Sequence, residues 1–131
     1  DNSSPVDLLI EHDRMLAWES RGYQASRIGN MMAVAQIVSQ YEEYAERDDE
    51  DLRSECVTLG MLLEIGVSRG DLLEKLKLRM VWEMLPMLEL HKECLAQGLS
   101  VDQPDEDRDE REVRMEMINQ LHMAAFRKTL E

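Results

Sequence analysis

Histidine and glutamate three residues apart on one helix would be the clearest sign of chemistry in a helical chain, because Glu-x-x-His segments bind di-iron centres. The chain has three histidines: His12, His91 and His122. None has a glutamate three residues earlier. The nearest acids, Glu11 and Glu89, are one and two residues away, and such neighbours do not share a helix face. We therefore predict no metal site. We expect His12 and His91 at the surface and His122 at the edge of the core, without a catalytic role.

Cysteine chemistry is the second possibility. Cys56 and Cys94 lie 38 residues apart, and the sequence has no Cys-x-x-Cys pair and no Cys/His cluster. A zinc site needs closely spaced ligands of these types. A nucleophilic cysteine would need a histidine brought close by the fold. We expect both thiols to be small buried hydrophobic groups, in a protein of a reducing compartment.

Glycine-rich phosphate loops such as GxGxxG and GxxxxGKS do not occur in the sequence, so we predict no nucleotide cofactor. One short stretch is basic, with Arg69, Lys75, Lys77 and Arg79. Nucleic-acid binding would require more positive charge and an aromatic platform. We expect these four side chains to face solvent and to pair with acidic residues.

Negative charge dominates the chain, which carries a net charge of −13. Residues 42–55 contribute −6 and residues 102–116 contribute −5, so two short blocks supply −11 of this total. Such blocks repel polyphosphate and anionic lipid, and we predict no direct binding to nucleic acid or membranes. We expect them to maintain solubility or to attract a basic protein partner. In the second block the candidate partner-binding residues are Asp105, Glu106, Asp107, Asp109, Glu110 and Glu112.

The ten methionines are the most informative positive signal. Methionine is flexible and polarizable, so it fills irregular cores and also lines adaptable binding surfaces. Between residues 78 and 90, apolar side chains surround the expected helix almost completely. Such a helix is either central in the fold or covered by a partner on its spare side. We therefore predict a hydrophobic partner-binding site at Met80, Trp82, Met84 and Met87.

The elements that position these residues are helices, because apolar residues recur at three- and four-residue spacing throughout the chain. This spacing predicts five helices, over about 5–22, 24–46, 48–66, 68–97 and 105–131, and no strand. The expected helix starts and stops are set by N-cap residues and by glycines: Ser4, Asp48 and Ser68, and Gly22, Gly66 and Gly98.

Three residues that disfavour helices fall inside the expected ones. We expect Gly29 to mark a place where another helix packs closely, and Gly60 to cost about 1 kcal/mol relative to alanine. Pro86 removes one backbone hydrogen bond and clashes with the preceding turn, so a kink is expected near Trp82–Pro86.

Taken together, these patterns predict an all-α bundle of about five helices with a long, Pro-kinked fourth helix. The length of 131 residues is that of one ordinary domain. Residues 1–98 are expected to form a helical core of four helices and residues 99–104 a linker. Residues 105–131 are expected to form a C-terminal helix that packs on the core or on a partner subunit. The polar start has no signal-peptide pattern, so we expect a cytoplasmic protein.

The sequence contains no recognisable catalytic constellation, so we expect a non-enzymatic protein–protein interaction module without a cofactor. It would act as an adaptor, regulator or assembly factor, self-associating through the fourth or fifth helix and using acidic surfaces for a basic partner. The alternative is an acidic mimic of nucleic acid that inhibits a nucleic-acid-binding protein. A helical enzyme or small-ligand binder is the third hypothesis, and no motif supports it.

Overall fold

The computed structural model describes residues 5–100 and 108–130, and in these two ranges all regular structure is helical. The described chain has seven helices: α1 (Pro5–Ser20), α2 (Ala25–Ile28), α3 (Met31–Glu46), α4 (Asp49–Thr58), α5 (Arg69–Met84), α6 (Met87–Ala96) and α7 (Glu110–Thr129). The predicted all-α class is confirmed, whereas the division into five helices is too coarse.

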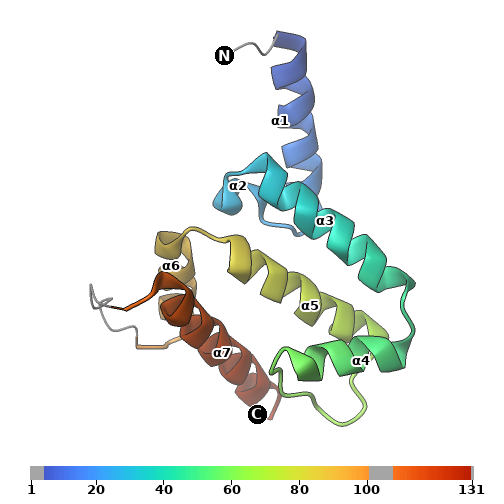
Figure 1. Ribbon diagram of the computed structural model, residues 1–131, viewed down its shortest axis with the longest axis vertical. Helices are drawn as coiled ribbons and strands as arrows, with labels where there is room; N and C mark the ends of the chain where they lie inside the picture. Colours follow the sequence, from blue (N-terminus) through green and yellow to red (C-terminus); the bar gives the residue numbers. More distant parts are fainter. Residues whose placement is uncertain (1–4, 101–107, 131) are drawn as a thin grey trace.

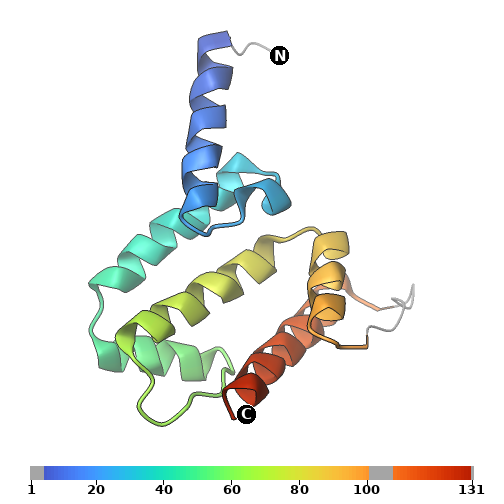
Figure 2. The ribbon, with the colours of Figure 1, turned by 180° about the vertical axis from the view of Figure 1, so that it is seen from behind.

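Helix α5 lies in the middle of the body, with α3 and α4 packed against it and α7 on its other side (Figure 1). Helix α6 turns away from the end of α5 and packs on α7. Helix α1 contacts α2 and the start of α3, and the rest of it projects away from the body, as both views show (Figure 2).

Two clusters of buried side chains form the core. The larger one joins residues of α2, α3, α5, α6 and α7, including Ile37, Val81 and Ile118. The smaller one joins α3, α4 and α5 around Leu52 and Leu76. Met80 packs against both clusters, so α5 connects the two halves of the core.

Two predicted helix interiors are in fact helix ends. Gly29 has a φ of +69° and caps α2, and Asn30 then begins α3 by accepting a hydrogen bond from Ala33 N at 3.1 Å. Gly60 has a φ of +85° and lies just beyond the end of α4. Its N–H donates to Val57 O, and Met61 N donates to Cys56 O. Glycine tolerates this left-handed conformation, so both glycines terminate helices, and the third predicted helix ends at Thr58 instead of Gly66.

Pro86 breaks the predicted fourth helix into α5 and α6, where we had predicted a kink. A proline disfavours helical geometry in the residue before it, and Leu85 accordingly has a ψ of 140°. Pro86 has no N–H to donate to Trp82 O, four residues earlier. Arg114 of α7 supplies the missing donor, since its Nη1 donates to Trp82 O at 3.0 Å and to Leu85 O at 2.7 Å.

Four other predicted helix ends are confirmed, and the predicted N-cap Ser4 lies outside the described residues. The side chains of Asp48 and Ser68 accept hydrogen bonds from Asp51 N and Asp71 N, and so cap α4 and α5. Gly22 and Gly98 have positive φ angles just after α1 and α6.

The predicted boundary between core and C-terminal helix falls mostly outside the described residues. Residues 101–104 of the predicted 99–104 linker and residues 105–107 of the predicted last helix lie there. In the described part, Asp109 caps α7 by accepting from Arg111 N, and Met117, Ile118 and Leu121 of α7 enter the larger core cluster. Among the described helices, none has the length and apolar content that crossing a membrane requires.

Candidate functional site: a groove between α3 and α5

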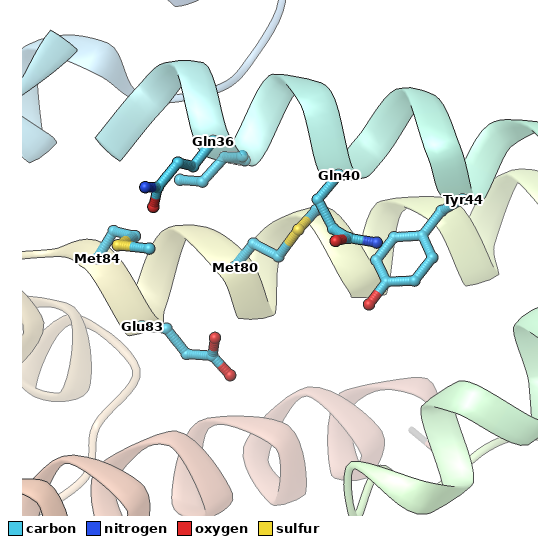
Figure 3. A pocket seen from close by; sticks show the side chains of 7 residues that line it. Gln36, Gln40, Tyr44, Met80, Glu83 and Met84 are labelled. Carbon is cyan, nitrogen blue, oxygen red and sulfur yellow. The ribbon is translucent and has the colours of Figure 1, made fainter. Parts of the chain in front are cut away.

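A groove of about 270 Å³ lies between α3 and α5. Figure 3 shows side chains of both helices converging on it. The residues that line it are Gln36, Ile37, Gln40, Tyr44, Met80, Glu83 and Met84. Ile37 is buried, Met80 is half-buried and Met84 is 38% exposed, so the apolar lining extends from the core to solvent.

Helical spacing explains why these side chains meet. Gln36, Gln40 and Tyr44 follow one another at intervals of four on α3, and Met80 and Met84 do the same on α5. The two rows lie along neighbouring helices, and the thioethers of Met80 and Met84 lie between them (Figure 3). Because methionine adapts its shape, this lining suits an apolar side chain inserted by another molecule.

Polar groups at the edge of the groove are acidic or neutral. Glu83 accepts a hydrogen bond from Arg79 Nε at 2.9 Å and keeps 41% of its side chain exposed. The Tyr44 hydroxyl donates to Glu55 Oε1 at 3.3 Å. Burial, and secondarily the charge of Glu55, raises the pKa of Tyr44 to about 12, so this hydroxyl remains protonated. Both carboxylates already have a cation nearby, since Glu83 is paired with Arg79, and Glu55 lies 3.8 Å from Arg47, whose guanidinium stacks on the Tyr44 ring.

Of the four predicted hydrophobic site residues, Met80 and Met84 lie in the groove and the other two do not. Trp82 is 6% exposed and points into the core, where its ring meets His122 edge-on at 5.0 Å between centroids. Its Nε1 has no hydrogen-bond partner among the described residues. Met87 is half-buried against the larger core cluster. The apolar side chains that surround residues 78–90 therefore mostly belong to the core, because α5 is central.

The predicted acidic site is only partly described. Asp105, Glu106 and Asp107 lie outside the described residues. Asp109 caps α7, and Glu110 lies 3.8 Å from Arg114. Glu112 is exposed. The structure thus gives Asp109 and Glu110 local roles in α7.

A buried polar cluster around Arg79 was missed by the sequence analysis, which had placed this residue on a solvated face. Arg79 is 4% exposed. Its Nη1 donates to Leu59 O at 2.9 Å and contacts His122 Nε2 at 3.2 Å. Because guanidinium only donates, Nε2 must accept, and the imidazole is neutral with its proton on Nδ1. Burial, followed by the charge of Arg79, lowers the pKa of His122 to about 4.

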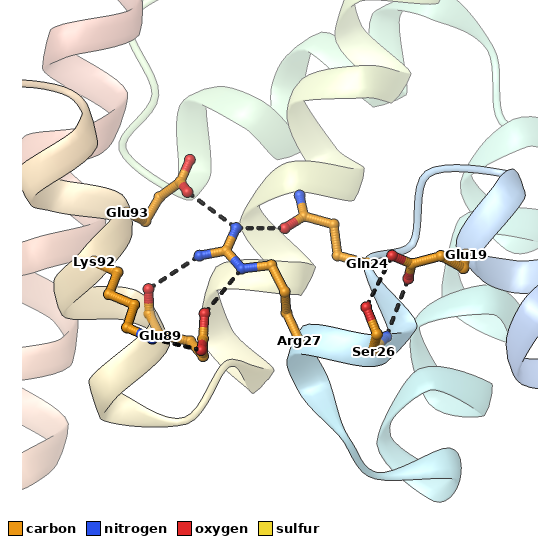
Figure 4. Close-up of polar contacts among 7 residues, drawn as sticks. All are labelled: Glu19, Gln24, Ser26, Arg27, Glu89, Lys92 and Glu93. Atoms are coloured by element: carbon orange, nitrogen blue, oxygen red, sulfur yellow. Dashed lines mark hydrogen bonds and ion pairs between the residues drawn. The ribbon is translucent and has the colours of Figure 1, made fainter.

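A second polar cluster joins α2 to α6 (Figure 4). Arg27 donates to Glu89 and Glu93 at 3.1 and 3.0 Å and to Gln24 at 2.7 Å. The hydrogen bond from Arg27 is the main reason why the pKa of Glu89 is lowered. Arg27 of α2 thus binds two carboxylates of α6, and we interpret the cluster as a structural clamp between these helices.

The remaining reactive side chains lie apart. Cys56 and Cys94 are buried as predicted, and burial raises the pKa of both thiols, which disfavours the nucleophilic thiolate. In the described ranges, no three His, Cys, Asp or Glu side chains gather in a way that could hold a metal ion.

No protein-family model, no curated protein and no solved structure matches the chain.

Proposed function

We propose that the chain is a non-enzymatic protein–protein interaction module whose α3–α5 groove accepts an apolar side chain of a basic partner segment. The observation that carries this proposal is the exposed methionine surface of Met80 and Met84, flanked by Glu83 and by the hydroxyl of Tyr44. Methionine-lined grooves accept varied apolar side chains, and the net charge of −13 on the whole chain favours a cationic segment.

The size of the groove supports a protein ligand over a small molecule. Its volume of about 270 Å³ is near the lower end of the roughly 300–1,000 Å³ of ordinary small-ligand pockets. It has room for one or two side chains, since one water molecule occupies about 30 Å³ of liquid. Its lining offers one carboxylate, already paired with Arg79, and neither a histidine nor a thiol.

Peptides selected from a random library on the immobilised protein provide the test. We expect them to share one apolar residue flanked by lysine or arginine. In spectra of protein labelled with ¹³C-methyl methionine, they should shift the Met80 and Met84 signals. Met84→Lys should weaken their binding at least tenfold, because it places a cation at the groove.

Met123→Lys is the matched control, since Met123 is 45% exposed on α7, away from the groove. It adds the same charge and should leave binding unchanged. Equal losses in both variants, or selected peptides that leave the Met80 and Met84 signals in place, would exclude the groove as the site.

A further inference from the structure

Helix α1 carries apolar side chains that the rest of the described chain does not cover. It projects from the body, and none of its residues is buried (Figures 1 and 2). Five large apolar residues of α1 are between 48% and 64% exposed: Val6, Leu8, Leu9, Ile10 and Leu16. Only Met15 and Trp18 pack against the core. Several large exposed apolar residues on one helix are typical of an interaction site.

The direction of Leu9 and Leu16 shows that the described body does not cover them. Each helical residue turns by about 100°, so Leu9 and Leu16, seven residues apart, lie on the same side of α1. Trp18 lies about 180° around the helix from Leu9. Because Trp18 faces the body, Leu9 and Leu16 face away from it. The body could not cover them without a rotation of α1 that would expose Trp18.

Charge decides which kind of molecule fits. Apart from His12, the charged residues of α1 are four acids and one base, a net charge of −3: Asp7, Glu11, Asp13, Glu19 and Arg14. A second copy of α1 would bring the same excess of negative charge, and an anionic membrane would repel it. At about 100° per residue, Asp13 and Glu19 lie beside Leu9 and Leu16, whereas Asp7 and Glu11 lie on the side of Trp18. A helix rich in lysine and arginine would meet Asp13 and Glu19, which also accepts hydrogen bonds from Ser26, while its apolar side meets Leu9 and Leu16.

We propose that α1 is a docking helix for a cationic amphipathic helix of another protein. The two helices pair along the side of Leu9 and Leu16, and basic residues of the partner lie against the acids of α1. This inference rests on the proposed function as an interaction module, but it names a second surface, separate from the α3–α5 groove.

The probe is a synthetic helical peptide as long as the 16 residues of α1, with leucine on one side and lysine on the others. Binding is measured by titration calorimetry, with ¹³C-methyl methionine spectra to locate the peptide. We expect Leu9→Gln/Leu16→Gln to weaken binding at least tenfold. The peptide should shift the Met15 signal, and Leu9→Gln/Leu16→Gln should abolish that shift while any shift of Met84 remains. A version with glutamate for lysine should not bind.

The matched control is Leu88→Gln/Leu95→Gln. These leucines of α6 are also seven residues apart and 69% and 59% exposed, against 62% and 55% for Leu9 and Leu16. The control variant should bind normally, and circular dichroism should show the same helical content in both. Equal losses in the two variants, or no binding to the unmodified chain, would overturn the proposal.

Two further results would replace it with another occupant. A dimer of the free chain in sedimentation equilibrium that Leu9→Gln/Leu16→Gln dissociates would show that a second copy covers α1. A shift of Met84 instead of Met15 would place the peptide in the groove. That last outcome overturns the role of α1 and leaves the proposed function intact. Loss of library-peptide binding in Met123→Lys as well as in Met84→Lys would exclude the groove and leave the proposed role of α1 intact.

Discussion

At the scale of single residues, Arg79 shows how a buried charge is accommodated. The guanidinium has a carboxylate partner in Glu83 at 2.9 Å, a carbonyl acceptor in Leu59 and an imidazole acceptor in His122. A buried charge is tolerated when it is paired and its donors are used. Arg79 has both an ion-pair partner and acceptors for its Nε and Nη1 donors. Burial, followed by the charge of Arg79, keeps His122 in its neutral form.

We predict that His122 makes stability fall as the pH decreases from about 6.5 to about 4. The pKa of histidine is about 6.5 in the unfolded chain, and that of His122 is lowered to about 4 in the fold. Between these values the unfolded state binds more protons, so acid favours unfolding by up to about 1.4 kcal/mol per pH unit. Urea unfolding at several pH values should show this slope.

The comparison with His122→Gln isolates this contribution from that of the many carboxylates. In this variant the free energy of unfolding should fall less steeply between pH 6.5 and 4, whatever its value at neutral pH. His12→Gln, at an exposed position, should keep the slope of the unmodified chain. If the free energies of unfolding of the unmodified chain and of His122→Gln change in parallel with pH, His122 is not the group that causes the loss of stability in acid.

At the scale of helices, the junction of α5 and α6 depends on α7. Arg114 donates to Trp82 O and Leu85 O, the carbonyl groups that the break at Pro86 leaves without helical partners. We predict that Arg114→Met, which retains the aliphatic stem, lowers the free energy of unfolding by about 1.5–3 kcal/mol, the range for hydrogen bonds to a charged group. Urea denaturation measures this loss, and hydrogen exchange should accelerate at the Leu85 amide, which donates to Val81 O.

Arg111→Met is the control on the same helix, because Arg111 is exposed. It should change stability by less than about 0.5 kcal/mol. If both variants unfold at the same urea concentration, the break between α5 and α6 is held by packing alone.

Helix ends were predictable where their signals agree with the apolar pattern. Asp48 and Ser68 stand before apolar stripes, and Gly98 stands after one, so both kinds of signal coincide. At Gly29 and Pro86 the apolar pattern continues across the break, since the helices on both sides bury residues in the same core. Periodicity alone could not reveal that the backbone changes direction there.

The candidate groove was predictable only in part. Sequence singled out Met80 and Met84 because their segment is unusually apolar, and both lie in the groove. It could not identify Gln36, Gln40 and Tyr44, which lie on α3 about 40 residues earlier. Which side of α3 meets α5 is fixed by the packing of Ile37 and Val81 in the shared core, and no local spacing encodes that pairing.

At the scale of the whole molecule, burial and exposure are unevenly distributed. The buried residues of the two core clusters lie between Tyr23 and Leu121, and Met80 joins the clusters. Helix α1 contributes only the half-buried Met15 and Trp18 at its end near the body. The fold therefore does not need the first three turns of α1, although these turns carry the most exposed apolar surface of that helix.

We predict that removing residues 1–14 changes the free energy of unfolding by less than about 1 kcal/mol, because no described residue among them is buried. The melting temperature followed by circular dichroism should then shift by only a few degrees. Leu121→Ala serves as the comparator, since Leu121 is 2% exposed in the core and its truncation should cost about 2–5 kcal/mol. A comparable loss on removing residues 1–14 would mean that α1 stabilises the body. Its exposed leucines would then have to be explained by the fold itself, without a partner helix.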